Sequence, residues 1–122
     1  MKLLNLVAVI ILVMMLIGCS SAPDDIVISY CKAIDAGKIE EAESFLSKDA
    51  SATLQSAGGK WLLAEAGSKF KQRKGISKIK ITRKKITGNS AVVDFVYNFK
   101  DGTKFGDSFP LVKENGAWKI SR

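Results

Sequence analysis

Apolar and polar residues alternate along the C-terminal half of the chain, and three glycine-containing pairs interrupt the alternation. These pairs are Gly88-Asn89, Asp101-Gly102 and Asn115-Gly116. Such dipeptides supply the positive φ angles that two-residue hairpin turns require. The segments around them therefore predict four antiparallel strands joined as a meander, at residues 76–87, 90–100, 103–114 and 117–121.

The alternation also assigns the strand residues to two faces of the sheet. One face is predicted to carry apolar side chains, namely Ile79, Ile81, Val93, Phe95, Tyr97, Phe99, Phe105, Phe109, Leu111, Trp118 and Ile120. The other face is predicted to carry polar side chains, namely Lys78, Lys80, Thr82, Lys84, Asp94 and Lys104. The apolar face needs a cover that excludes water.

The N-terminal half shows the longer period of helices. A first helix is predicted to begin at Pro23, with two acids in its first turn, and to end at Gly37. Apolar residues between 39 and 46 predict a second, and those between 61 and 70 a third that ends near Gly75. Helices followed by a meander predict an α+β fold in which the helices cover the sheet.

The first twenty residues, MKLLNLVAVIILVMMLIGCS, have the layout of a secretory signal: one cation, a short apolar stretch and a small residue. A membrane-spanning helix, the alternative, needs about 20 apolar residues and is less well matched. The segment from Leu16 to Cys19 resembles the lipobox of bacterial lipoproteins. That resemblance implies a signal peptide at 1–18, an acylated Cys19 with a short linker at 19–23, and a single domain at 24–122.

A lipid anchor on Cys19 predicts the location of the protein. Two or three acyl chains hold a protein stably in a bilayer, so the resemblance implies a membrane-anchored lipoprotein of the bacterial cell envelope. Ser20 after the cysteine favours the outer membrane, facing the periplasm, if the host is an enteric bacterium. The alternative is a secreted protein without lipid.

The chain is basic, with 19 Lys and Arg residues against 12 Asp and Glu and a net charge of +7. Nine of these cations lie in residues 69–85, where the only aromatic residue is Phe70. Single-stranded nucleic acid is bound with interleaved aromatic residues, so no nucleic-acid partner is expected. The run is predicted to be a solvated surface or a contact with anionic headgroups through Lys78, Lys80 and Lys84.

Several chemistries are unexpected in this composition. The sequence contains no histidine, which leaves no Ser/His/Asp triad and no histidine metal ligand, and we expect neither metal nor cofactor. If Cys19 carries lipid, the second cysteine, Cys31, has no partner in the chain. Cys31 shares a helical stripe with Val27 and Tyr30, so we expect it in the core.

Four segments, YCKAIDAGKIEEAESFL, NSAVVDFVY, KDGTKF and LVKENGAWKI, resemble small bacterial lipoproteins with a domain of unknown function. These proteins belong to the nuclear transport factor two-like, or cystatin-like, superfamily. The resemblance implies a curved sheet wrapped around a long helix into a cone, often with a pocket and often dimeric. Members range from isomerases to binding modules, so the resemblance implies no single activity.

These observations favour a non-catalytic binding or interaction module, as a monomer or homodimer. Its pocket, for a small apolar ligand, would be lined by Tyr30, Phe95, Tyr97, Phe99 and Trp118. The alternative is that these residues fill the core of a structural protein of the envelope, which pairs through its outer sheet face.

An enzyme of the isomerase type is less favoured. It would need a carboxylate beside Tyr30 and Tyr97. The alternation instead places Asp94 on the polar face, and Asp101 and Asp107 in or near a turn.

Overall fold

The computed structural model describes residues 21–121, and the predicted signal segment with Cys19 lies outside this range. The described helices are α2 (Pro23–Asp35), α3 (Ile39–Ser44), α4 (Lys48–Ser56) and α5 (Lys60–Gln72). They are followed by β1 (Ile76–Thr87), β2 (Ser90–Phe99), β3 (Lys104–Glu114) and β4 (Ala117–Ile120). The predicted α+β class is confirmed. Within residues 21–121 no helix is both long enough and apolar enough to cross a bilayer.

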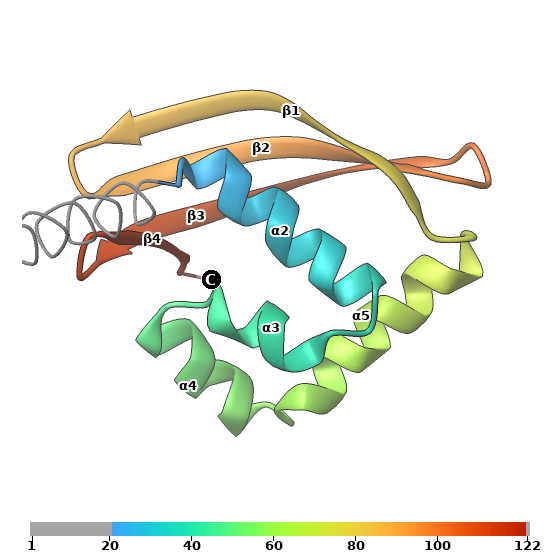
Figure 1. Cartoon of the computed structure of the whole chain (residues 1–122), viewed down its shortest axis with the longest axis horizontal. Helices are drawn as coiled ribbons and strands as arrows, with labels where there is room; N and C mark the ends of the chain where they lie inside the picture. The colour runs from blue at the N-terminus through green and yellow to red at the C-terminus, as the bar shows by residue number, and fades with distance from the viewer. Residues whose placement is uncertain (1–20, 122) are drawn as a thin grey trace, which may run out of the picture.

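The four strands form an antiparallel sheet in the order β1-β2-β3-β4, as the hairpin signals predict. In the last hairpin Asn115 and Gly116 have φ angles of 52° and 80°, the left-handed conformation that Asn and Gly adopt most readily. The helices lie together on one side of the sheet, which curls toward them along β1 (Figure 1). No helix within residues 21–121 covers the opposite face, which we call the outer face.

A bulge in β1 changes which residues face the helices. Ile81 lies opposite Phe95, but the register then slips and Arg83 lies opposite Asp94. An extra residue of this kind bends the strand and inverts the alternation beyond it. Lys84 consequently shares the helix side of the sheet, and its Nζ lies 3.1 Å from Asp24 Oδ1. The prediction that Lys84 belongs to the outer face is wrong.

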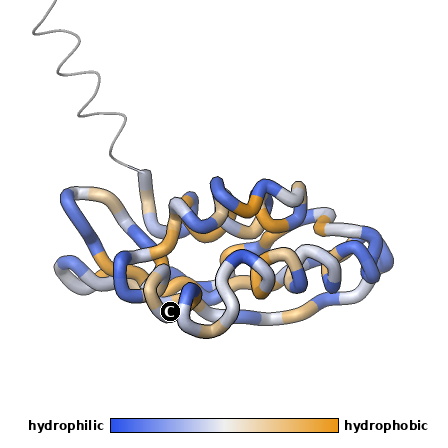
Figure 2. Tube along the Cα trace, turned by 90° about the horizontal axis from the view of Figure 1, so that it is seen from below, coloured by the Kyte–Doolittle hydropathy of each residue, from blue (hydrophilic) through white to orange (hydrophobic). Residues whose placement is uncertain are grey.

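Aromatic side chains of β2 form the centre of the core. Phe95, Tyr97 and Phe99 are all at least 94% buried, and the rings of Phe95 and Tyr97 lie 5.1 Å apart. Phe70 of α5 covers Tyr97 at a ring distance of 5.2 Å. Apolar residues gather between the helices and the sheet (Figure 2). Phe105 shares this face opposite Tyr97 but is 57% exposed, because the helices do not cover the start of β3.

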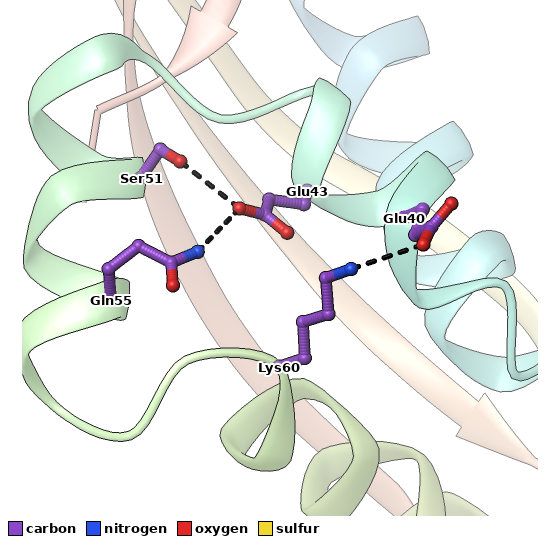
Figure 3. A network of polar contacts seen from close by, with 5 residues as sticks. All are labelled: Glu40, Glu43, Ser51, Gln55 and Lys60. Carbon is purple, nitrogen blue, oxygen red and sulfur yellow. Dashed lines mark hydrogen bonds and ion pairs between the residues drawn. The ribbon is translucent and has the colours of Figure 1, made fainter.

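Helix α4 is absent from the sequence-based expectations because it has no apolar stripe; only Ala50 is buried. Its start is fixed by Ser47, whose Oγ accepts a hydrogen bond from the Ala50 N–H at 3.1 Å. Polar contacts hold it against α3: Glu43 accepts hydrogen bonds from Ser51 and Gln55 (Figure 3). The sequence does contain a signal for the start of this helix: Ser47 is followed two residues later by an acid, Asp49.

Helices α2 and α5 approach each other closely at Gly67. A Cβ atom at this position would lie 2.9 Å from the backbone oxygen of Ile34. That oxygen belongs to the α2 backbone and cannot rotate away, so only glycine permits this spacing. The approach keeps Phe70, on the next turn of α5, over the aromatic residues of β2.

We predict that Gly67→Ala lowers the free energy of unfolding by about 1–3 kcal/mol, since the added methyl group separates α5 from α2. Urea denaturation followed by circular dichroism measures the change. Gly106→Ala is the matched control, because the nearest atom to its Cβ lies 3.9 Å away. A gain of about 1 kcal/mol for Gly67→Ala, as helix propensity alone would give, contradicts the prediction.

Candidate ligand-binding pocket

A pocket of about 350 Å³ opens between α2, α5 and the adjoining parts of β2 and β3. Its size lies at the lower end of the range of small-molecule sites. Six aromatic rings make most of its wall, and three charged groups join them. The lining residues are Tyr30, Ile34, Ala66, Lys69, Phe70, Arg73, Tyr97, Phe99, Phe105, Asp107 and Phe109.

The structure brings together three of the five residues that the sequence suggested for a pocket, namely Tyr30, Tyr97 and Phe99. Phe95 is 1% exposed and belongs to the core beneath them. Trp118 lines a separate hollow, because β4 pairs with residues 111–114 of β3 whereas the pocket lies over 105–109. Lys113 Nζ lies 5.3 Å from the centre of the Trp118 ring.

Asp107 is a pocket residue that the sequence reasoning misplaced. It was expected in or near a turn, but it lies within β3, opposite Phe95 and on the helix side of the sheet. The available signal was the alternation itself, since Phe105, Asp107 and Phe109 are spaced two residues apart. Asp94, as expected, lies on the outer face, where it accepts a hydrogen bond from Ser108 Oγ at 2.6 Å.

Two phenol groups lie beside this carboxylate and stay protonated. Burial, together with the nearby negative charges of ionised Cys31 and Asp107, raises the pKa of Tyr30 to about 12. Burial also raises the pKa of Tyr97 well above its usual range, with Cys31 as the next cause. Both hydroxyl groups are therefore hydrogen-bond donors at neutral pH.

Cys31 lies behind the pocket, in the core, as the helical stripe predicts. It is 0% exposed, and its Sγ donates a hydrogen bond to Tyr97 Oη at 3.6 Å. Burial raises the pKa of the thiol to about 12, the hydrogen bond to Tyr97 partly opposes this, and the charge of Asp107 adds to it. A thiol in this setting is not a nucleophile at neutral pH.

Cations from α5 stand at the exposed side of the pocket. The Arg73 guanidinium donates a hydrogen bond to Thr103 Oγ1 at 2.9 Å, and its Cζ lies 5.5 Å from the centre of the Phe99 ring. Thr103 in turn donates to Asp101, and these hydrogen bonds lower the pKa of Asp101. Arg73 is thus oriented between the β2–β3 turn and the sheet, and exposed Lys69 lies one turn earlier on α5.

The three lysines predicted to contact an anionic surface do not lie on one face of the sheet. Lys78 and Lys80 are exposed on the outer face, opposite Asn98 and Val96, whereas Lys84 is not on that face. A contact of this face with an anionic surface stays a prediction. Between residues 21 and 121, no three His, Cys, Asp or Glu side chains are grouped so that they could hold a metal ion.

A four-stranded antiparallel sheet curled around helices, with a pocket on the covered face, defines a domain of the nuclear transport factor two-like class. Within this class the chain belongs to the family described as Domain of unknown function (DUF4878), whose model matches residues 17–121. The nuclear transport factor two-like fold and the domain of unknown function that the sequence segments suggested are confirmed. No curated protein sequence matches the chain.

Solved structures share the fold at low sequence identity. One is a crystal structure of a Campylobacter jejuni protein described as a candidate NTF2-like transpeptidase, with a TM-score of 0.72 and 22% identity. The match covers 84% of this chain and 99% of that one. Another is a SEC-C motif containing protein from Rhodopseudomonas palustris, with a TM-score of 0.52, 9% identity, and coverage of 75% and 68%. Such likenesses establish the fold alone.

The raised pKa values predict how stability depends on pH. Between pH 9, the ordinary pKa of the thiol, and about 12, the folded protein retains protons on Cys31 that the unfolded chain releases. The contribution of Cys31 to the free energy of unfolding should therefore be fully present below about pH 9 and be lost as the pH rises toward 12. Urea denaturation at stepped pH measures this loss.

A direct check uses the only two tyrosines in the sequence, Tyr30 and Tyr97. The near-ultraviolet absorbance of tyrosinate should appear in the folded protein only near pH 12 or above. A native-state midpoint near pH 10 for both residues, the value of an exposed phenol, contradicts the burial argument.

Proposed function

We propose that the protein is a non-catalytic binding module that holds a small, largely apolar ligand in the pocket between α2, α5 and the sheet. The observation that carries this proposal is the pocket itself. Six aromatic rings line about 350 Å³ of open space, which is the concave and mostly apolar form of small-molecule sites. A structural protein with a filled core, the alternative, does not need aromatic rings gathered around an open space.

Aromatic residues around the pocket support binding of an apolar body. Phe105 is 57% exposed at one side of the opening, and its ring centre lies 6.4 Å from that of Tyr97. Such a large ring in water is unfavourable unless a ligand or partner covers it. A ligand that extends from Tyr97 to Phe105 would bury it.

A catalytic role has less support. The Campylobacter jejuni neighbour is described as a candidate transpeptidase, but at 22% identity that activity does not transfer to this chain. Acyl transfer needs an activated nucleophile, and the thiol of Cys31 is buried and protonated. The placement of Asp107 with Tyr30 and Tyr97 favours a second candidate, proton transfer of the isomerase type, with Asp107 as base.

We predict that filling the pocket abolishes binding. Ala66 lines the pocket, so the ring of Ala66→Phe should occupy the space that a ligand needs. Isothermal titration calorimetry of the full chain in phospholipid nanodiscs, with 4-ethylphenol as the probe and empty nanodiscs as the blank, should show saturable binding to the wild type. Ala66→Phe should show none, and Ala52→Phe, on exposed α4, should bind like the wild type.

Three outcomes would contradict the proposal. Equal binding by Ala66→Phe, or none by the wild type, would remove the pocket as the site. Exchange of the α-protons of 2-indanone with deuterated water, accelerated by the wild type and lost in Asp107→Asn, would contradict the non-catalytic part and support proton transfer.

The proposal also places the module on a membrane of the bacterial envelope, anchored through Cys19. Helix α2 begins at Pro23, so only Ser20, Ser21 and Ala22 separate the anchor from the fold. A segment of three residues spans at most ~11 Å when extended. The domain would therefore lie close to the headgroups, in the outer membrane if the host is enteric.

We predict that Cys19→Ser removes the anchor. Bacteria that express the wild type with an alkyne-bearing palmitate should yield labelled protein in the membrane fraction, and Cys19→Ser should yield none. Cys31→Ser controls for labelling at the other cysteine. Labelling that persists in Cys19→Ser, or its absence in the wild type, would contradict the proposed anchor.

A further inference from the structure

The pocket is lined by charges of opposite sign. Asp107, which is half-buried, joins it from the sheet, whereas exposed Lys69 joins it from α5 and exposed Arg73 from the C-cap of that helix. We propose that its ligand is amphoteric, with an ammonium group held beside Asp107 and an anionic group held by Arg73 and Lys69. This inference rests on the proposed binding function and adds the chemical class of the ligand.

The position of Asp107 fits an ammonium group. The carboxylate lies on a wall with aromatic neighbours: the rings of Tyr30 and Phe109 meet edge to face at 5.7 Å, and both line the pocket with it. Aromatic faces attract cations, and the attraction is stronger where water is excluded. A carboxylate among such rings accepts hydrogen bonds from an ammonium group and also compensates its charge.

The position of Arg73 fits an anionic group. Its guanidinium is already fixed by Thr103 and by the Phe99 ring, so little side-chain entropy is lost when it binds. A guanidinium offers five N–H donors in one plane, of which Thr103 uses one, and pairs with carboxylate or phosphate in a two-point geometry. Lys69 lies four residues earlier, on the same side of α5, and adds a second charge.

The register of the sheet sets the distance between the positions of Asp107 and Arg73, and so between the two charged groups of the ligand. Asp107 lies opposite Phe95, whereas Arg73 lies over Phe99, four residues further along β2. At roughly 3.3 Å per residue, these positions are about 13 Å apart along the strand. An α-amino acid, whose two charges flank one carbon, is too short. The fitting class has an amine and a carboxylate or phosphate at opposite ends of an apolar body that lies over Tyr97 and Phe105.

Four probes with related bodies test this inference by calorimetry on the full chain in nanodiscs. They are 4-(2-aminoethyl)phenylacetate, 2-phenylethylamine, phenylacetate and neutral 4-ethylphenol. The first, which carries both charges, should bind about tenfold or more tightly than 4-ethylphenol. Asp107→Asn should weaken the two amines about tenfold and spare phenylacetate. Arg73→Gln should weaken the two carboxylates about tenfold and spare 2-phenylethylamine.

Matched variants separate charge in the pocket from charge elsewhere. Asp94→Asn removes a carboxylate from the outer face, and Lys71→Gln removes an α5 cation that does not line this pocket. Both should bind all four probes as the wild type does. Circular dichroism melts confirm that each variant is folded, and unchanged binding of 4-ethylphenol confirms that its pocket is intact.

The outcomes distinguish this inference from the proposed function. Equal affinity for all four probes, lost in Ala66→Phe, would overturn the amphoteric ligand and leave the binding pocket. Weakening of the amines by Asp94→Asn and of the carboxylates by Lys71→Gln would also overturn it, because net charge alone would then explain binding. Failure of every probe to bind the wild type would overturn the proposed function itself.

Discussion

The close contact between α5 and α2 at Gly67 determines most of the architecture. With the two backbones in contact there, Phe70 reaches the aromatic side chains of β2 and closes the core above Tyr97 and Phe99. The same contact sets how far α5 extends along the sheet, and it leaves the start of β3 uncovered at Phe105. The pocket is the space that remains where two helices in contact lie over a sheet that they cover only in part.

The elements with strong local signals could be predicted from the sequence. Turn dipeptides and a period of two fixed all four strands, and the stripe through Cys31 fixed the buried side of α2, because these signals act between neighbouring residues. Helix α4 escaped because its stability comes from Ser47 and Glu43 and not from an apolar stripe. The bulge after Ile81 could not be predicted for another reason. A register slip depends on both paired strands together, so the pattern of one strand alone does not indicate it.

For the pocket too, local patterns predict which side chains face the helices, whereas the open space depends on contacts between distant residues. The alternation of β2 predicts that Tyr97 and Phe99 face the helices. Whether the space above them is open depends on the position of α5, which the contact at Gly67 helps to set. Asp107 was misplaced because a polar residue near a turn signal was assigned to the turn. A carboxylate in the apolar phase of a strand faces the pocket, which makes it informative about what the pocket holds.

The position of β1 at the edge of the sheet gives the basic run a role that needs no partner. An edge strand twelve residues long exposes backbone N–H and C=O groups that could template the same strand of another copy. Lys78, Lys80, Arg83, Lys84 and Lys85 all lie on this strand. Two such edges repel each other, so crowded copies of the domain would stay separate and would not grow into continuous sheets. The basic charges on β1 therefore disfavour strand pairing between two copies at this edge.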